Sequence, residues 1–487
     1  MHAVIIGSGI AGISAAIRLK VKGYEVSVYE ANSYPGGKLT EINVGDYRFD
    51  AGPSLFTMPH LVDELFVLAG KNPTDYFTYI QKKIACNYFY DDGTTLKGYA
   101  EPNAFSEEVE RVLGVSKIKV LDYLKGCGER FSLTGPLFLE KSLHDIRTFF
   151  SVDVLKAVMQ LRKLHIFQTM HSVNAKALKH PKLIQLFDRY ATYNGSSPYL
   201  APGILTMIPH LEFNIGTFFP VGGMHSITGA LVKLAMDIGV HFQFNQAVQE
   251  VEILGNKTKG IKVNGQLIHA DLVVSNMDIV PTYKELLPKV KQPQEILSQE
   301  RSSSALIFYW GIKARFKELD LHNIFFTEDY QQEFDLLFNK GEVTDDPTVY
   351  VNISAKENPS DAPDGSENWF VMVNVPSDQG QDWEAIIPKV KANVLRKLSR
   401  LLKMEIEALI EEEDLLTPKL IQQRTSSLGG ALYGTSSNAR NAAFLRHANT
   451  HSKIKGLHFC GGSVHPGGGI PLCLLSGKIA TDKIKSI

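Results

Sequence analysis

Cysteine is scarce in this sequence, with four residues in a chain of 487. Disulfide-stabilised secreted domains have a much denser set of cysteines. No pair has the CxxC spacing or the neighbouring histidines of a zinc site. We therefore expect neither a disulfide framework nor a metal site, and a reducing cytoplasm is the simplest location. The four residues are Cys86, Cys127, Cys460 and Cys473.

A surplus of charge is also lacking. Lys and Arg together number 51, Asp and Glu number 52, and the net charge is −1. Proteins that bind nucleic acid through its phosphates usually have a basic excess. Nucleic acid is therefore not an expected partner of this chain.

Long hydrophobic runs are missing as well. We find no uncharged apolar stretch of about 18 residues, the length that crosses a bilayer, so no spanning helix is expected. The apolar run at residues 2–6 has no basic segment before it, so no signal peptide is expected. Contact with a membrane surface remains compatible with the sequence. The hydrophobic fraction of 44% and the charged fraction of 21% are those of an ordinary globular protein of roughly three domain-sized units.

The first 30 residues have the pattern of a dinucleotide-binding unit. An apolar strand at residues 3–6 leads into a glycine-rich turn at 7–12 and then a helix over 13–20. A second strand, at 25–29, ends at Glu30. This order of strand, glycine turn, helix and strand predicts a Rossmann-like unit that opens the chain.

Each glycine of the turn has a physical role in such a unit. Gly7 permits the tight turn, Gly9 lets the backbone approach a pyrophosphate, and Gly12 lets the helix pack closely on the strand. The start of the helix offers free N–H groups to the phosphates. A carboxylate at Glu30 accepts hydrogen bonds from a ribose diol and repels a 2′-phosphate. The pattern thus predicts FAD or NAD rather than NADP.

Two further segments favour FAD. Residues 31–38 contain a second glycine pair, which allows the chain to approach the cofactor again, and Lys38, which can reach a phosphate or the flavin edge. Residues 49–54 contain the Gly-Pro pair. Each segment alone is compatible with an ordinary turn.

The tail of the chain is the third glycine-rich region. A strand at 456–462 ends in glycines, and a loop at 463–471 precedes a helix over 472–485. The run that ends with Gly468 and Gly469 gives a dense array of free N–H groups before a proline-started helix. Such an array suits the N1–C2=O edge of a flavin, where negative charge develops on reduction. A glycine-rich surface loop is the alternative interpretation.

In this order, the segments resemble the bacterial carotenoid desaturases of the phytoene desaturase type, within the FAD-dependent amine oxidase superfamily. The resemblance implies an α/β fold with a discontinuous Rossmann-like FAD-binding domain, an α+β substrate domain, and FAD as the cofactor. The segments with the resemblance span nearly the whole chain and are 7–12, 35–38, 50–54, 219–224, 270–276 and 461–471.

The expected domains are discontinuous. The FAD-binding domain is predicted to comprise residues 1–75, 215–285 and 425–487. The substrate domain is predicted to comprise residues 76–214 and 286–424, with possible membrane contact.

The resemblance also implies site residues. Val248 would meet the adenine through its backbone, although periodicity alone favours an ordinary strand there. Asp145 lies where related desaturases have an acid near the flavin and is the candidate proton acceptor, with an exposed helix cap as the alternative. The residues expected to bind FAD are Gly7, Gly9, Gly12, Glu30, Gly37, Lys38, Gly52, Pro53, Ser54, Val248, Gly462, Gly468, Gly469 and Ile470.

The implied activity removes two hydrogens from adjacent sp3 carbons of a polyene, with hydride transfer to flavin N5. The cation left by hydride loss is delocalised over the polyene, so the remaining proton becomes acidic and no strong base is needed. This agrees with the lack of a Ser-His-Asp, Cys-His or paired-carboxylate signature in the sequence.

Within the family, residues 52–59 resemble the desaturases of the 1-hydroxycarotenoid 3,4-desaturase type, with phytoene desaturase as the alternative. An FAD-dependent amine oxidase and a non-catalytic flavoprotein or carotenoid carrier are more remote hypotheses. The expected partners are a carotenoid, a membrane surface, and oxygen or a quinone as electron acceptor.

Residues 151–170 have apolar positions at helical spacing among a few basic ones. The pattern is typical of a helix at an apolar mouth or a bilayer surface, and also of a surface helix that covers a core. We expect a cytoplasmic protein peripherally associated with the inner face of the cell membrane.

Overall fold

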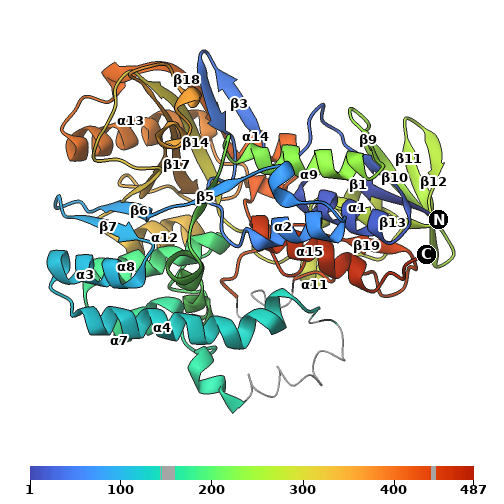
Figure 1. Cartoon of the computed structure of the whole chain (residues 1–487), viewed down its shortest axis with the longest axis horizontal. Helices are drawn as coiled ribbons and strands as arrows, with labels where there is room; N and C mark the ends of the chain where they lie inside the picture. The colour runs from blue at the N-terminus through green and yellow to red at the C-terminus, as the bar shows by residue number, and fades with distance from the viewer. Residues whose placement is uncertain (143, 145–158, 440–445) are drawn as a thin grey trace.

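The computed structural model describes residues 1–142, 144, 159–439 and 446–487. It has two lobes (Figure 1). Both termini lie in the right-hand lobe of the view, with α1 and α15, and the left-hand lobe contains the strands around β14 and β17.

The first lobe is built on a parallel sheet with strand order β19-β13-β1-β2-β9. Its strands come from the beginning, the middle and the tail of the chain. β1 is buried on both faces of the sheet, as its continuous apolar run predicts. The strands are β1 (His2–Ile6), β2 (Glu25–Tyr29), β9 (Val240–Gln243), β13 (Leu272–Ser275) and β19 (Leu457–Phe459).

Helices cover one face of this sheet and a small antiparallel sheet covers the other. The helices share one apolar core with the parallel strands, and the strands β10, β11 and β12 share a second core on the opposite face. The helices are α1 (Ile10–Val21), α2 (His60–Leu68), α9 (His225–Asp237) and α15 (Ile470–Asp482). The antiparallel strands are β10 (Val248–Leu254), β11 (Lys257–Val263) and β12 (Gln266–His269).

The second lobe contains a seven-stranded mixed sheet with strand order β18-β14-β17-β16-β15-β6-β7. α13 (Trp383–Leu402) packs on one face through an apolar core. The strands are β6 (Ile84–Phe89), β7 (Thr95–Tyr99), β14 (Ser304–Ile312), β15 (His322–Phe325), β16 (Val349–Asn352), β17 (Glu367–Val375) and β18 (Ile410–Leu416).

A helical layer completes this lobe and shares its own apolar core with β6, β7 and β15. Its helices are α3 (Pro102–Leu113), α4 (Lys117–Thr134), α7 (Met170–Leu178), α8 (Pro181–Asp188) and α12 (Tyr330–Asp335). The remaining short elements are α10 (Ile279–Pro281), α11 (Gln294–Leu297), α14 (Pro418–Thr425), β3 (Glu41–Val44), β4 (Tyr47–Asp50), β5 (Tyr79–Gln81) and β8 (Phe218–Pro220).

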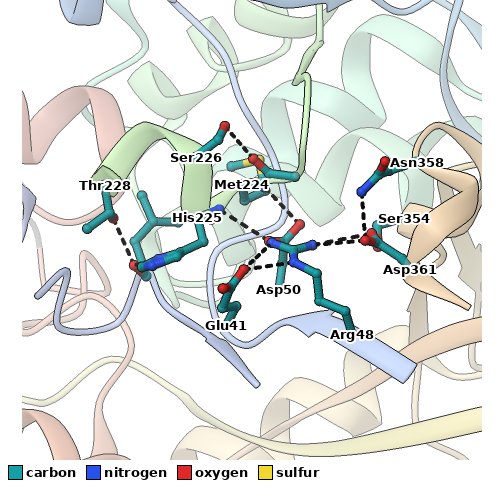
Figure 2. A network of polar contacts seen from close by, with 12 residues as sticks. Glu41, Arg48, Asp50, Met224, His225, Ser226, Thr228, Ser354, Asn358 and Asp361 are labelled. Atoms are coloured by element: carbon teal, nitrogen blue, oxygen red, sulfur yellow. Dashed lines mark hydrogen bonds and ion pairs between the residues drawn. The ribbon is translucent and has the colours of Figure 1, made fainter. Parts of the chain in front are cut away.

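A buried ion network joins the two lobes at the end of β4 (Figure 2). Arg48 donates to Asp50 at 2.8 Å and to Asp361 at 3.3 Å. Asp50 also accepts the backbone N–H groups of Met224 at 2.8 Å and His225 at 3.2 Å, at the start of α9. The network therefore fixes the chain directly before the predicted Gly-Pro segment.

The expected helix over 151–170 is not continuous in its described part. Residues 151–158 lie outside the described residues, Leu161–Leu164 form a 3-10 turn, and α7 begins at Met170. The backbone at Gln168 and Met170 bonds to Gly203 and Ala201 instead of continuing a helix. Backbone hydrogen bonds to residues 201 and 203 thus replace the helical hydrogen bonds that the local pattern predicts.

Among the described residues, no helix combines the length and the apolar composition needed to cross a membrane.

Candidate functional site

One cavity of about 690 Å³ extends from the glycine-rich segments of the first lobe to the sheet of the second. The predicted FAD-binding residues that line it are Gly7, Gly9, Glu30, Gly37, Lys38, Gly52, Pro53, Ser54, Val248, Gly462, Gly468, Gly469 and Ile470. Gly12 lies behind this wall, and Asp145 lies outside the described residues. Segments from the beginning, middle and tail of the chain therefore meet at one cavity.

The glycine turn fits a closely approaching ligand. A Cβ atom at Gly12 would lie 2.3 Å from the Gly7 carbonyl oxygen, and one at Gly9 would lie 2.7 Å from Asn276 Nδ2. The second glycine pair runs beside the turn, because Gly36 donates its N–H to the Ser8 carbonyl at 2.9 Å. The backbone of the turn is thus open to the cavity and crowded behind it, as a pyrophosphate cradle requires.

Glu30 is buried and its carboxylate is fully engaged. One oxygen accepts the Ser8 N–H and hydroxyl, each at 2.8 Å. The other accepts the backbone N–H and the side-chain amide of Asn32, each at 2.9 Å. A ribose diol can replace the hydroxyl and the amide while the two backbone bonds keep the carboxylate in place. The sequence analysis did not identify Ser8 and Asn32, because neither belongs to the glycine pattern.

Lys38 lines the cavity and also bonds to the backbone of a distant segment. Its Nζ donates to the carbonyls of Ala431 at 2.7 Å and Leu432 at 2.9 Å. Burial lowers the pKa of Lys38 to about 8, while the nearby Asp278 opposes this shift. Lys38 thus links the second glycine pair to the segment before the tail and places a buried cation at the cavity wall.

The tail glycines form a tight cradle at the start of α15. A Cβ atom at Gly468 would lie 2.8 Å from the Tyr433 Cα, and one at Gly462 would lie 3.3 Å from the Gly468 Cα. Gly469 has a φ of +103° and no atom within 4 Å of the position that its Cβ would take. The N-terminus of α15 therefore faces free space in the cavity, which suits an electron-rich flavin edge.

Arg446 is a further buried cation in this cradle. Its guanidinium donates to the carbonyls of Tyr433 at 2.8 Å, Thr435 at 2.8 Å and Gly462 at 3.1 Å. Burial lowers its pKa to about 10. Arg446 lies outside the glycine motifs, and no local pattern indicates it.

The sheet of the second lobe forms the other wall. Met372 pairs with Ile307 and Tyr350, Ile307 pairs with Leu416, and Tyr350 pairs with Ile324, so the five residues form one row across five strands. All five line the cavity. The further apolar residues that line the cavity include Phe131, Phe138, Leu139, Ile204, Leu205, Ile208, Leu211, Phe334 and Leu337. The space can hold an elongated apolar molecule beside the glycine segments.

A few polar groups lie in this apolar part. The Ser54 and Tyr350 hydroxyls are 2.8 Å apart, and the Tyr350 hydroxyl is 2.7 Å from His322 Nδ1. Burial lowers the pKa of His322 to about 3, so its ring is neutral at ordinary pH. Burial also raises the pKa of Glu333 to about 7. The sequence analysis identified neither His322 nor Glu333, because only the sheet register brings their strands and helix to the cavity.

The described residues contain no group of three or more His, Cys, Asp or Glu side chains that could hold a metal ion. All four cysteines are free thiols.

Comparison with known proteins places these features in context. The family model described as flavin containing amine oxidoreductase matches residues 10–485. The chain is 52% identical to a 1-hydroxycarotenoid 3,4-desaturase of Flavobacterium sp. (strain P99-3), over 99% of this chain and 98% of that protein. It is 31% identical to a 4,4′-diapolycopene oxygenase of Methylomonas sp., over 99% of this chain and 97% of that protein.

Solved structures with the same fold are more distant in sequence. An oxidoreductase from Methanosarcina mazei matches with a TM-score of 0.64 at 15% identity, over 99% of this chain and 100% of that one. Wild-type putrescine oxidase bound to putrescine matches with a TM-score of 0.64 at 13% identity, over 99% and 98% of the two chains. Together with the mixed helices and sheets described above, these matches confirm the predicted fold class.

Proposed function

Since the chain belongs to the flavin-containing amine oxidoreductase family, we propose that it is a desaturase that introduces the 3,4 double bond of a 1-hydroxylated carotenoid. Membership of the family confirms the resemblance predicted from the glycine-rich segments, with FAD as the cofactor and oxidoreduction as the class of reaction. The observation that supports the specific substrate most strongly is the 52% identity to the Flavobacterium desaturase over 99% of the chain.

The residues of the cavity fit FAD. The crowded glycine turn, the engaged carboxylate of Glu30 and the free space before α15 match a pyrophosphate, a ribose and a flavin edge in that order. Bound FAD would supply the hydride acceptor. Lys38, Arg446 and the N-terminus of α15 place positive charge at the cradle, which favours an electron-rich ring there.

The chain's own contribution to the reaction is alignment and exclusion of water. The apolar row across the sheet and the further apolar residues of the cavity hold an extended polyene beside the flavin cradle. Because loss of hydride leaves a delocalised cation, a weak acceptor is sufficient for the remaining proton. The role of Asp145 as that acceptor stays a prediction.

The substrate also supports a location at a membrane. A carotenoid dissolves in the bilayer and must enter an apolar mouth. Met159 and Phe167 in the segment 151–170 are 79% and 71% exposed, and apolar side chains of this kind can enter a bilayer surface. We place the protein in the cytoplasm at the inner face of the cell membrane, with oxygen or a quinone as the electron acceptor.

Product analysis tests this proposal. The protein with FAD in liposomes is incubated separately with phytoene, an acyclic 1-hydroxylated carotenoid and a monocyclic 1-hydroxylated carotenoid. We expect a red-shifted product with one additional double bond from a hydroxylated substrate and none from phytoene. Turnover of phytoene alone would favour a phytoene desaturase. Release of peroxide with an amine would favour an amine oxidase, and an oxygenated carotenoid would favour the activity named for the Methylomonas relative. FAD or carotenoid binding without turnover would indicate a non-catalytic flavoprotein or carrier.

A further inference from the structure

His322 is a buried, neutral polar side chain on the wall of the apolar part of the cavity. It is 3% exposed, and its Nε2 has no hydrogen-bond partner among the described residues. A buried polar atom without a partner costs free energy until one arrives. An unpaired nitrogen at the cavity wall therefore points to a polar atom of the ligand.

The hydrogen bonds of the other ring nitrogen, Nδ1, determine whether Nε2 is a donor or an acceptor. Nδ1 faces the Asn352 side-chain amide at 3.2 Å and the Tyr350 hydroxyl at 2.7 Å. The same amide atom donates to the Leu321 carbonyl at 3.0 Å, so it is the nitrogen and can only donate. Nδ1 is therefore the acceptor, and the proton of the neutral ring lies on Nε2. His322, a residue of the cavity wall, thus has one unused N–H donor, and that atom is itself buried.

Glu212 and Arg189 also line this region, and they bind one another. Glu212 accepts hydrogen bonds from the Tyr190 and Tyr193 hydroxyls and from Arg189. Arg189 also lies over the Tyr190 ring, with its Cζ 4.4 Å from the ring centroid. Although Arg189 Nε is unpaired, its guanidinium is held in this cluster.

Glu333 accepts the Thr348 N–H at 2.7 Å and its hydroxyl at 2.6 Å. Its carboxylate is thus also engaged. Among these groups, His322 Nε2 and Arg189 Nε are unpaired N–H donors, and only Arg189 is held in an ion pair.

The position of His322 suits the hydroxyl of the proposed substrate. Ser54 belongs to the Gly-Pro segment predicted to pass the flavin ring, and only two hydrogen bonds, through Tyr350, separate it from His322. In a 1-hydroxylated polyene that is oxidised at C3 and C4, three bonds separate the oxygen from C3. A group that binds this oxygen must therefore lie close to the flavin site, and His322 is linked through Tyr350 to the segment predicted to pass the flavin.

We propose that the Nε2–H of His322 donates a hydrogen bond to the 1-hydroxyl oxygen of the carotenoid and so selects hydroxylated substrates. This proposal rests on the proposed function. His322 is a specificity-determining residue that positions C3 and C4 against the cofactor. It takes no proton from the substrate.

The test is the ratio of kcat/KM for an acyclic 1-hydroxycarotenoid to that for the same polyene with hydrogen in place of the hydroxyl. The ratio is measured within each variant, so a change in the amount of folded enzyme cancels. The wild type should favour the hydroxylated polyene by about tenfold or more, since one buried hydrogen bond is at stake. His322→Leu and His322→Phe should both bring the ratio close to one, while His322→Gln, which keeps an N–H donor, should retain part of it.

His180→Leu is the matched control. His180 also has a buried ring nitrogen, Nδ1, without a partner among the described residues, but it is absent from the residues that line the cavity. This variant should keep the wild-type ratio. A wild type without preference, or an unchanged ratio in both His322→Leu and His322→Phe, would overturn the proposal for His322 alone. A wild type that desaturates neither polyene would overturn the proposed function, and this inference with it.

Discussion

Close packing around single glycines determines whether the glycine turn, the predicted pyrophosphate site, can form. A Cβ atom at Gly12 would lie 2.3 Å from a backbone oxygen that cannot move without opening the turn at Gly7. Gly229, in the exposed face of α9, has no atom within 4 Å of its Cβ position. A side chain is thus excluded at Gly12 and tolerated at Gly229, although both glycines lie in helices.

We predict that Gly12→Ala abolishes retention of FAD during purification and lowers the free energy of unfolding, because the helix must move away from the strand. Gly229→Ala should retain FAD and stabilise the protein by about 0.5–1 kcal/mol. Flavin absorbance per protein and urea unfolding measure both effects. FAD retained at the wild-type level by Gly12→Ala would contradict this account of the turn.

Glu333 gives the protein a pH dependence of stability. Burial raises its pKa from 4.5 to about 7, although its hydrogen bonds from Thr348 oppose the shift. The folded state therefore binds more protons than the unfolded state between these values, so this contribution to stability is complete below pH 4.5 and is lost as the pH rises through 7.

Glu333→Gln should remove this dependence. Relative to the wild type, the variant should gain stability as the pH rises from 4.5 to about 7, by on the order of 2–3 kcal/mol. Urea unfolding of both proteins across this range is the measurement. Parallel curves for the two proteins would show that Glu333 ionises in the folded state as it does in the unfolded chain.

Among single residues, those that belong to a local sequence motif could be predicted. Thirteen of the fourteen residues expected to bind FAD line one cavity, and the remaining one, Gly12, packs behind the turn. Their contacts with FAD stay predictions. The contacts of Lys38 with two carbonyls could not be predicted, because they join segments 393 and 394 residues apart. His322 and Arg446 belong to no local motif, and only the fold brings them to the cavity.

At the element scale, β4 and α9 are held by the network of Arg48 and Asp50. Asp50 has a 2% exposed side chain and accepts both Arg48 and the first N–H groups of α9. Glu41 pairs with the same arginine but is 40% exposed. Burial lowers the pKa of Arg48, but Asp50 and Asp361 outweigh it and raise the pKa well above its usual range. Arg48 is thus charged whenever the protein is folded.

We predict that Asp50→Asn lowers the free energy of unfolding by roughly 3 kcal/mol, because it leaves a buried charge with weaker partners. Glu41→Gln should cost less than about 1 kcal/mol, since its carboxylate is solvated. The measurement is the free energy of unfolding in urea of both variants, compared at a common dependence on urea concentration. An equal loss in the two variants would mean that burial of Asp50 does not matter.

Periodicity predicted the buried elements better than the exposed ones. The strands expected at 3–6 and 25–29 correspond to β1 and β2, and the tail helix begins at Ile470, close to the expected start. The segment 151–170 differs, because its described part pairs with the backbone near Gly203. An amphipathic pattern cannot distinguish these outcomes, since it does not register backbone pairing with a separate segment of the chain.

At the scale of the whole molecule, the parallel sheet explains why distant segments meet. β1, β13 and β19 are neighbours in the sheet, although they lie at the beginning, middle and tail of the chain. The carboxyl ends of parallel strands meet at one edge, so the glycine segments that follow them face one crevice. The sequence predicted this convergence by resemblance, whereas the pairing of the second lobe's sheet depends on long-range contacts and was not predictable. The domain boundaries stay predictions.

The most direct test of the central claim is a single turnover without oxygen. The FAD-loaded protein in liposomes is mixed with an acyclic 1-hydroxycarotenoid, and the absorbance of the flavin and the polyene is followed together. The account predicts that the flavin absorbance falls at the same rate as the polyene spectrum shifts to the red, with one polyene converted per flavin. A flavin that stays oxidised while the polyene is converted, or a polyene that stays unchanged beside a flavin bleached by an amine, would contradict it.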